Sequence, residues 1–132
     1  MECLEFGILK VSKMENKEFS HKLEYRTRKL ALSIIKLSCS LPDYPEGRVI
    51  RSQITKSGTS IGANYREPNR ARSRADFTNK IKICESEANE TIYWIEIIQD
   101  LQWADKQSID LIMSEANELL AIFTSIGKNL KS

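Results

Sequence analysis

Residues 77–98 read FTNKIKICESEANETIYWIEII, and this stretch decides the fold. Apolar side chains recur in it at steps of three or four residues, a spacing that places them on one face of an α-helix. The members of this stripe are Phe77, Ile81, Cys84, Ala88, Ile92, Ile95 and Ile98. From this spacing we predict a single helix from about Ser73 to Trp103.

Three more segments show the same period and predict helices over about 19–40, 45–66 and 106–129. Their expected core residues are Leu23, Leu30, Ile34, Leu37 and Leu41, then Val49, Ile50, Ile54, Ser57 and Ile61, and finally Ile109, Met113, Ala116, Leu120, Phe123 and Leu130. Since the links between helices are short, neighbouring helices must run in opposite directions. The sequence therefore predicts an all-α fold, an antiparallel up-down-up-down four-helix bundle.

The expected helix ends carry recognisable signals. Pro45 suits the first turn of a helix, where its missing N–H costs nothing. Ser73, with Asp76 three residues later, resembles a capping box, and Asp105 can cap the last helix.

Two glycines, Gly58 and Gly62, lie inside the predicted helix over 45–66. Each costs about 1 kcal/mol relative to alanine in a helix interior. We expect the close approach of a neighbouring helix to compensate for this cost. A kinked or flexible segment is the alternative.

The chain has 132 residues, enough for one domain, which we place at 18–132; residues 1–17 are expected to be an extension outside the bundle. Only five glycines and three prolines weigh against a β-sandwich or barrel. The sequence has no long apolar run and no secretory signal, so no membrane association is expected. Three scattered cysteines fit a cytoplasmic protein, and Cys39 and Cys84 are expected to be small core residues.

Charge is unevenly distributed, although the formal net charge is only +2. Residues 48–82 hold nine basic and two acidic side chains, a net charge of +7. Residues 83–118 hold nine acidic and one basic side chain, a net charge of −8. Such a polarised molecule can attract polyanions at one end. Alternatively, the two halves attract each other, within one chain or between subunits.

Arginines are densest in residues 65–74, the link between the second and third predicted helices. A guanidinium group matches the geometry of phosphate oxygens, and the start of the third helix adds free N–H groups. Tyr65 is a candidate to stack on a base. We predict a sequence-independent site for the phosphate backbone of RNA or DNA, formed by Arg66, Arg70, Arg72, Arg74, Arg51 and Lys56. The alternative is a solvated loop whose arginines pair with the acidic third and fourth helices.

The third predicted helix carries a second apolar face, roughly 100° to 160° from its main stripe. This face contains Ile83, Trp94, Ile97 and Leu101. A face this wide is either buried between two neighbouring helices or exposed for self-association. We expect it to be the interface of a homo-oligomer.

Patterns of catalytic and metal-binding residues are absent from the sequence. His21 is the only histidine, so a di-iron bundle would lack its Glu-x-x-His motifs and a nucleophilic triad would depend on His21 alone. Glu87 and Glu90 are expected to belong to a solvated helix flank. No glycine-rich phosphate loop occurs. We therefore expect no enzymatic activity, no cofactor and no metal.

Residues 51–67, RSQITKSGTSIGANYRE, resemble the hallmark of the four-helix-bundle proteins encoded in intervening sequences of bacterial 23S ribosomal RNA genes. The positions that match the family pattern are Ser60, Ile61, Asn64, Glu67, Arg70, Ser73 and Phe77. Residues 85–96 also look like the family's third helix, and the resemblance extends over about residues 18–130. Many family members have glycine after the glutamate of the turn, where this chain has Pro68.

This resemblance implies a bundle that assembles as a ring, most often a pentamer, and it implies no catalytic residues. A related branch, the accessory proteins of diversity-generating retroelements, works with a reverse transcriptase and RNA through a basic surface. RNA and a reverse transcriptase are thus implied partners, besides further copies of the chain, while DNA is a partner expected from the arginine-rich link alone. Two hypotheses follow: a nucleic-acid-associated accessory protein that uses the arginine-rich link, or a protein-binding scaffold that uses the region of Trp94 and Leu101.

Overall fold

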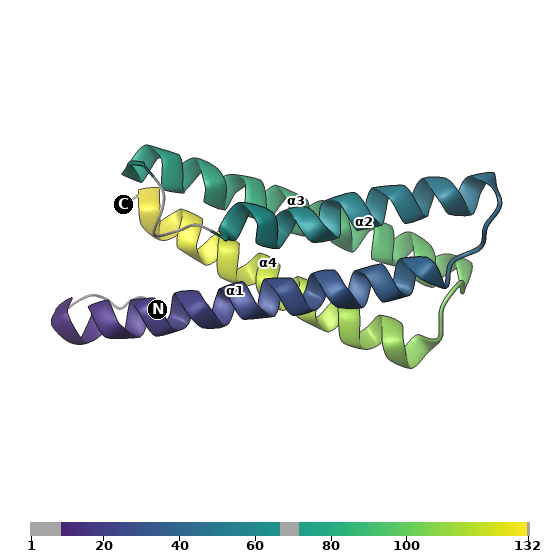
Figure 1. The fold of residues 1–132 in the computed structure, drawn as a ribbon, viewed down its shortest axis with the longest axis horizontal. Coiled ribbons are helices and arrows are strands. Elements are labelled where there is room, and N and C mark those ends of the chain that lie inside the picture. Colours follow the sequence, from purple (N-terminus) through teal and green to yellow (C-terminus); the bar gives the residue numbers. More distant parts are fainter. Residues whose placement is uncertain (1–8, 67–71, 132) are drawn as a thin grey trace.

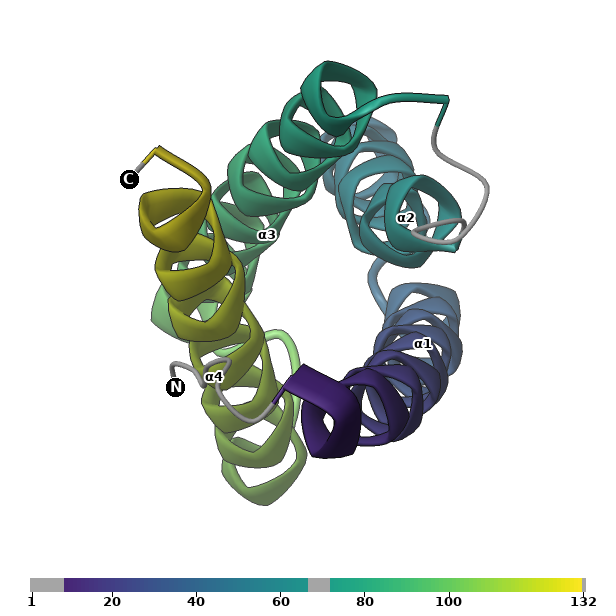
Figure 2. The same ribbon diagram turned by 90° about the vertical axis from the view of Figure 1, so that its left-hand side faces the viewer.

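The computed structural model describes residues 9–66 and 72–131 as four α-helices with short links, and these residues contain no strand. The helices are α1 (Leu9–Cys39), α2 (Pro45–Tyr65), α3 (Arg74–Leu101) and α4 (Lys106–Lys131). Figure 1 shows successive helices running in opposite directions, and Figure 2 shows them around a common core in the order α1, α2, α3, α4. The predicted all-α four-helix bundle is confirmed.

The start of α1 differs from the prediction, because the helix begins at Leu9 rather than near Phe19. The added residues are rich in lysine, glutamate and other helix formers and contain neither glycine nor proline. A helix nucleated by the apolar stripe can therefore extend through them at little cost. The sequence pattern missed this extension because periodicity indicates burial rather than helix formation. In Figure 1 this end of α1 reaches beyond the other helices.

The predicted stripes supply most of the core. All expected core residues of α1 are buried, and so are those of α3 apart from the half-buried Phe77. In α2, the prediction for Val49 is wrong, since this side chain is 58% exposed. Neighbouring positions on a helix point about 100° apart, and in α2 it is Ile50 rather than Val49 that points toward the core and packs there. In α4, Leu119 is fully buried and Leu120 only partly, for the same reason.

Two of the predicted helix starts are confirmed by their local contacts. Pro45 occupies the first turn of α2. The Asp105 carboxylate accepts hydrogen bonds from the N–H groups of Gln107 at 3.0 Å and Ser108 at 3.3 Å, and thereby caps α4.

The two glycines of α2 lie where α1 approaches most closely. A Cβ atom at Gly58 would lie only 2.6 Å from Cδ1 of Ile34, and one at Gly62 would lie 3.0 Å from Oγ1 of Thr27. Any larger residue would push the helices apart or displace a buried side chain. The expected close approach is confirmed, and α2 runs unbroken through both glycines.

Candidate nucleic-acid interface

Three of the predicted arginines lie at one end of the bundle, where α2 ends and α3 begins. Arg66 directly follows the last residue of α2, and Arg72 and Arg74 flank Ser73, the N-cap of α3. All three side chains are exposed. We call Arg66, Arg72 and Arg74 the basic corner. Arg70, predicted to belong to the same site, lies outside the described residues.

The start of α3 is closed by its own side chains. The Ser73 hydroxyl accepts a hydrogen bond from the N–H of Asp76 at 3.0 Å, and the Asp76 carboxylate accepts one from the N–H of Arg72 at 3.0 Å. This arrangement agrees with the predicted capping signal. It also occupies backbone donors that an anion would otherwise use, so an anion at the basic corner would depend mainly on the guanidinium groups.

The corner arginines are not paired with the acidic helices. Within residues 9–66 and 72–131, neither Arg66 nor Arg72 forms an ion pair. Arg74 donates a hydrogen bond to the backbone carbonyl of Leu130 at 3.0 Å, which ties the start of α3 to the end of α4. For these three side chains, the described contacts favour a free positive surface over a neutralised loop.

The structure separates two predicted site residues from the basic corner. Arg51 lies near the other end of α2 and donates a hydrogen bond to the Asp43 carboxylate at 3.2 Å. Fifteen residues of helix, at about 1.5 Å per residue, place it roughly 22 Å along the axis from Arg66. Lys56 is exposed between the two. Arg51 therefore does not share a compact site with Arg66. Lys56 lies on α2 between these two residues, outside the basic corner.

The prediction that Tyr65 stacks on a base is wrong. Tyr65 is only 4% exposed, its hydroxyl donates to Oγ of Ser20 at 3.2 Å, and its ring centroid lies 5.7 Å from that of Phe123. Burial raises its pKa to about 12. Tyr65 follows Ile61 by four residues and so continues the core stripe of α2.

The predicted oligomer face lies along α3 and is partly exposed. Ile83, Trp94 and Ile97 are half-buried, and Leu101 is 48% exposed. Trp94 packs against the core with part of its ring, while its indole N–H donates to the Glu90 carboxylate at 3.2 Å. Trp94 therefore contributes to the core with one part of its ring and to the exposed face of α3 with the other.

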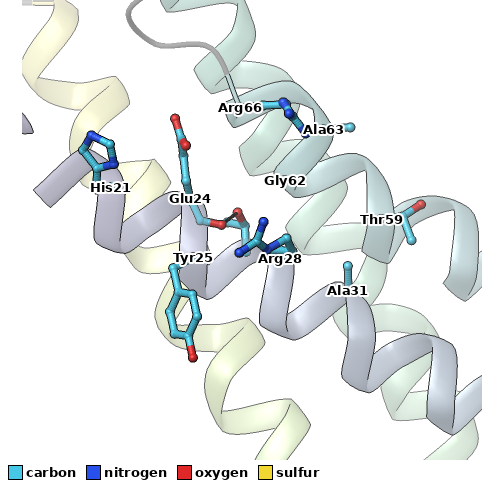
Figure 3. A pocket seen from close by; sticks show the side chains of 10 residues that line it. His21, Glu24, Tyr25, Arg28, Ala31, Thr59, Gly62, Ala63 and Arg66 are labelled. Atoms are coloured by element: carbon cyan, nitrogen blue, oxygen red, sulfur yellow. Dashed lines mark hydrogen bonds between the residues drawn. The ribbon is translucent and has the colours of Figure 1, made fainter.

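A groove that the sequence analysis missed lies between α1 and α2 (Figure 3), with a volume of about 570 Å³. Its charged lining consists of Glu24 and Arg28 from α1 and Arg66 at the end of α2. The small residues Gly62 and Ala63 also line it. The groove meets the basic corner because Arg66 belongs to both. Only the three-dimensional pairing of α1 with α2 brings these residues together, so no sequence signal identifies the groove.

The remaining candidate groups are the possible metal ligands and the two cysteines of the helices. Within the described residues, no cluster of three or more histidine, cysteine, aspartate or glutamate side chains can hold a metal ion. The Cys84 thiol is buried against the backbone carbonyl of Ile61, and burial raises its pKa to about 12. The prediction for Cys39 is wrong, because this last residue of α1 is exposed while Ser38 beside it faces inward.

The same part of the chain contains no helix with the length and apolar character needed to cross a bilayer.

Comparisons with known proteins agree with this fold. The sequence pattern of the family described as 23S rRNA-intervening sequence protein matches residues 21–125. The chain is also similar to a crystal structure, at 1.70 Å resolution, of a protein with unknown function from the S23 ribosomal protein family of Bacteroides thetaiotaomicron. The two share 37% sequence identity over 80% of this chain and 98% of that one, with a TM-score of 0.74. None of the curated proteins compared with the chain matches it. Since the family pattern covers most of the bundle, the chain belongs to the 23S rRNA-intervening sequence protein family.

Proposed function

We propose that this protein is a non-enzymatic accessory factor that binds the phosphate backbone of RNA through the basic corner. The observation that carries the proposal is the exposure of the Arg66 and Arg72 side chains without a carboxylate partner in the described parts of the chain. Arginines that served only to neutralise the acidic helices would contact those carboxylates. A guanidinium group left free in solvent instead suits an external anion.

The chemistry of the basic corner suits the nucleic-acid backbone better than a particular base sequence. Arginine side chains at a helix junction can bridge successive phosphates, which look alike in every sequence. The description of the matching family refers to 23S rRNA, and that of the similar crystal structure refers to a ribosomal protein family. These descriptions make RNA the first polyanion to test.

The test compares two doubly substituted variants that change net charge equally. Arg66→Glu with Arg72→Glu alters the basic corner, whereas Arg48→Glu with Lys106→Glu alters the opposite end of the bundle. We expect the first variant to lose RNA affinity and to lower the slope of log K against log salt by about two, roughly one for each phosphate contact removed. The second variant should bind like the unmodified protein. Equal losses in both variants, or no RNA binding by the unmodified protein at low salt, would contradict the proposal.

We also propose that copies of the chain assemble through the outer face of α3. The resemblance of the sequence to its family favours a pentamer. The observation that favours this candidate is the exposure of Leu101 (48%) on the same helix face as the half-buried Trp94 and Ile97. Leu101→Glu should lower the mass measured by light scattering. Leu111→Glu, at a 70% exposed leucine of α4, serves as the matched control and should not. A monomeric unmodified protein at micromolar concentration would remove this candidate.

A further inference from the structure

The outer surface of α1 adds positive charge beside the basic corner. Lys22, Arg28, Lys29 and Lys36 are exposed there, and none forms an ion pair within the described residues. In residues 18–36 of α1 the acidic side chains are Glu18, at the beginning of this range, and Glu24, in the groove. The positive surface therefore continues from the end of α2 onto α1, where the charge pattern of residues 48–82 gave no hint of it.

The groove between α1 and α2 combines the groups that one nucleotide requires. Arg28 extends from α1 toward α2, and Arg66 lies at the end of α2 (Figure 3), so two guanidinium groups line one groove. Its volume of about 570 Å³ lies within the range of roughly 300–1,000 Å³ found for pockets that hold small ligands. Glu24, the carboxylate of the groove, would repel a phosphate but can accept a hydrogen bond from a ribose 2′-hydroxyl.

Tyr25 supplies an aromatic surface at the edge of the same groove. It lines the groove, is 55% exposed, and projects from α1 on the side away from α2 (Figure 3). The ammonium group of Lys29 lies 5.6 Å from its ring centroid, so charge and ring occur together. Exposed aromatic rings among cations are the usual platform for unpaired bases. Bases in a duplex are already stacked and cannot reach such a ring.

We propose that the α1–α2 groove binds single-stranded RNA, with a phosphate held between Arg28 and Arg66 and the adjacent unpaired base stacked on Tyr25. This assignment rests on the proposed function, because Arg66 is shared with the basic corner. The Glu24 carboxylate favours RNA over DNA, since only RNA offers the 2′-hydroxyl.

The experiment measures the affinity of the full chain for a short single-stranded RNA, for DNA of the same sequence, and for the corresponding RNA duplex. Tyr25→Ala should weaken binding of the single-stranded RNA about tenfold and leave duplex binding unchanged. Tyr25→Phe should bind like the unmodified protein. Tyr44→Ala is the matched control, because Tyr44 is exposed to 47% in the link between α1 and α2, at the opposite end of the bundle from the basic corner, and it should have no effect. Arg28→Glu should weaken both RNA forms, and the DNA should bind more weakly than the RNA.

Three results would overturn the groove assignment: equal effects of Tyr25→Ala and Tyr44→Ala, equal loss of single-stranded and duplex RNA in Tyr25→Ala, or a changed oligomer mass in Tyr25→Ala. The last result would assign Tyr25 to a contact between copies of the chain. If the unmodified protein binds RNA and only the corner variant weakens it, the groove assignment fails while the proposed function stands. If the unmodified protein binds no RNA, the proposed function itself fails.

Discussion

Helix α1 contacts its two neighbours in two physically different ways (Figure 2). Against α2 it packs closely, with Ile34 over Gly58 and Thr27 over Gly62. Against α4 it meets few residues, and the main polar contact is Arg26, whose guanidinium donates to both oxygens of Glu115 at 2.8 and 2.9 Å and also contacts Glu118. One contact depends on shape and the other on charge.

This difference predicts which contact holds the bundle together. Truncation of a large side chain in a closely packed core lowers the free energy of unfolding by several kcal/mol. Ion pairs of partly exposed side chains contribute only about 0–1 kcal/mol, and salt screens them. The Arg26, Glu115 and Glu118 side chains are 31%, 34% and 63% exposed. We therefore expect the α1–α2 contact to carry the stability, and the bundle to open first between α1 and α4.

The largest effect is expected where the shape-dependent contact is truncated. Ile34 is fully buried against Gly58, so Ile34→Ala should lower the free energy of unfolding by about 2–5 kcal/mol through lost burial and a cavity. Urea denaturation at a fixed protein concentration measures this change. Leu32→Ala, at a 55% exposed leucine of the same helix, is the control and should change stability little. Equal costs at the two positions would contradict the importance of the α1–α2 packing.

The polar end of the α1–α2 contact predicts a loss of stability in alkali. Burial raises the pKa of Tyr65 from 10.0 to about 12. As the pH rises, the Tyr65 hydroxyl therefore ionises in the unfolded chain before it ionises in the folded one. The neutral hydroxyl stabilises the fold below pH 10, and this contribution is lost between pH 10 and about 12, a loss of about 2–3 kcal/mol. Cys84, whose pKa burial raises from 9.0 to about 12, acts in the same direction.

Unfolding free energies measured at several pH values between 9 and 12 check this prediction. Tyr65→Phe removes one of the two buried groups, Tyr65 and Cys84, whose pKa is raised. The free energy of unfolding of this variant should fall about half as steeply as the pH rises. The substitution also removes the hydrogen bond to Ser20, at a cost of about 1 kcal/mol near neutral pH. A fall as steep as in the unmodified protein would show that Tyr65 does not titrate as a buried group.

A smaller effect is expected when a methyl group is added at the closest approach. Gly58→Ala should lower stability by about 1–2 kcal/mol, because overpacking against Ile34 outweighs the better helix propensity of alanine. Gly62→Ala would bring its Cβ to 3.0 Å from Oγ1 and 3.3 Å from Cβ of Thr27, which are longer distances than at Gly58, and should cost less. In an Ile34→Val background, which lacks the Cδ1 atom nearest to the added methyl, Gly58→Ala should cost less than in the unmodified protein. Additive costs in this cycle would contradict a direct clash.

The sequence predicted the elements of the bundle well. The bounds of α2, α3 and α4 lie within about two residues of the prediction, because proline, capping residues and a strict apolar period mark them. Errors arose where one position decides between inside and outside. Val49 and Cys39 lie next to core-facing residues and turn outward, whereas Tyr65 turns inward. A single sequence gives the period of a helix but not the limits of its buried face.

The candidate site was less predictable, because it depends on which helices are neighbours. The arginine-rich link was visible as composition, and the structure shows three of its members exposed. The position of Arg28 in the groove could be predicted only with the knowledge that α1 lies against the glycines of α2. Similarly, Arg26 and Glu115 are 89 positions apart, and no sequence spacing associates them.

The smallest effect is expected at the charge-dependent contact. Hydrogen bonds to Glu115 and then Glu118 raise the pKa of Arg26 above its ordinary value, so this guanidinium stays charged at every accessible pH. Arg26→Met keeps the aliphatic stem and should cost less than about 1 kcal/mol at low salt, with the cost falling further as salt is added. Lys29→Met, which removes an exposed cation of α1 without an ion pair in the described parts of the chain, is the matched control. A cost for Arg26→Met that matches Ile34→Ala, or that ignores salt, would mean that charge and not shape holds α1 in the bundle.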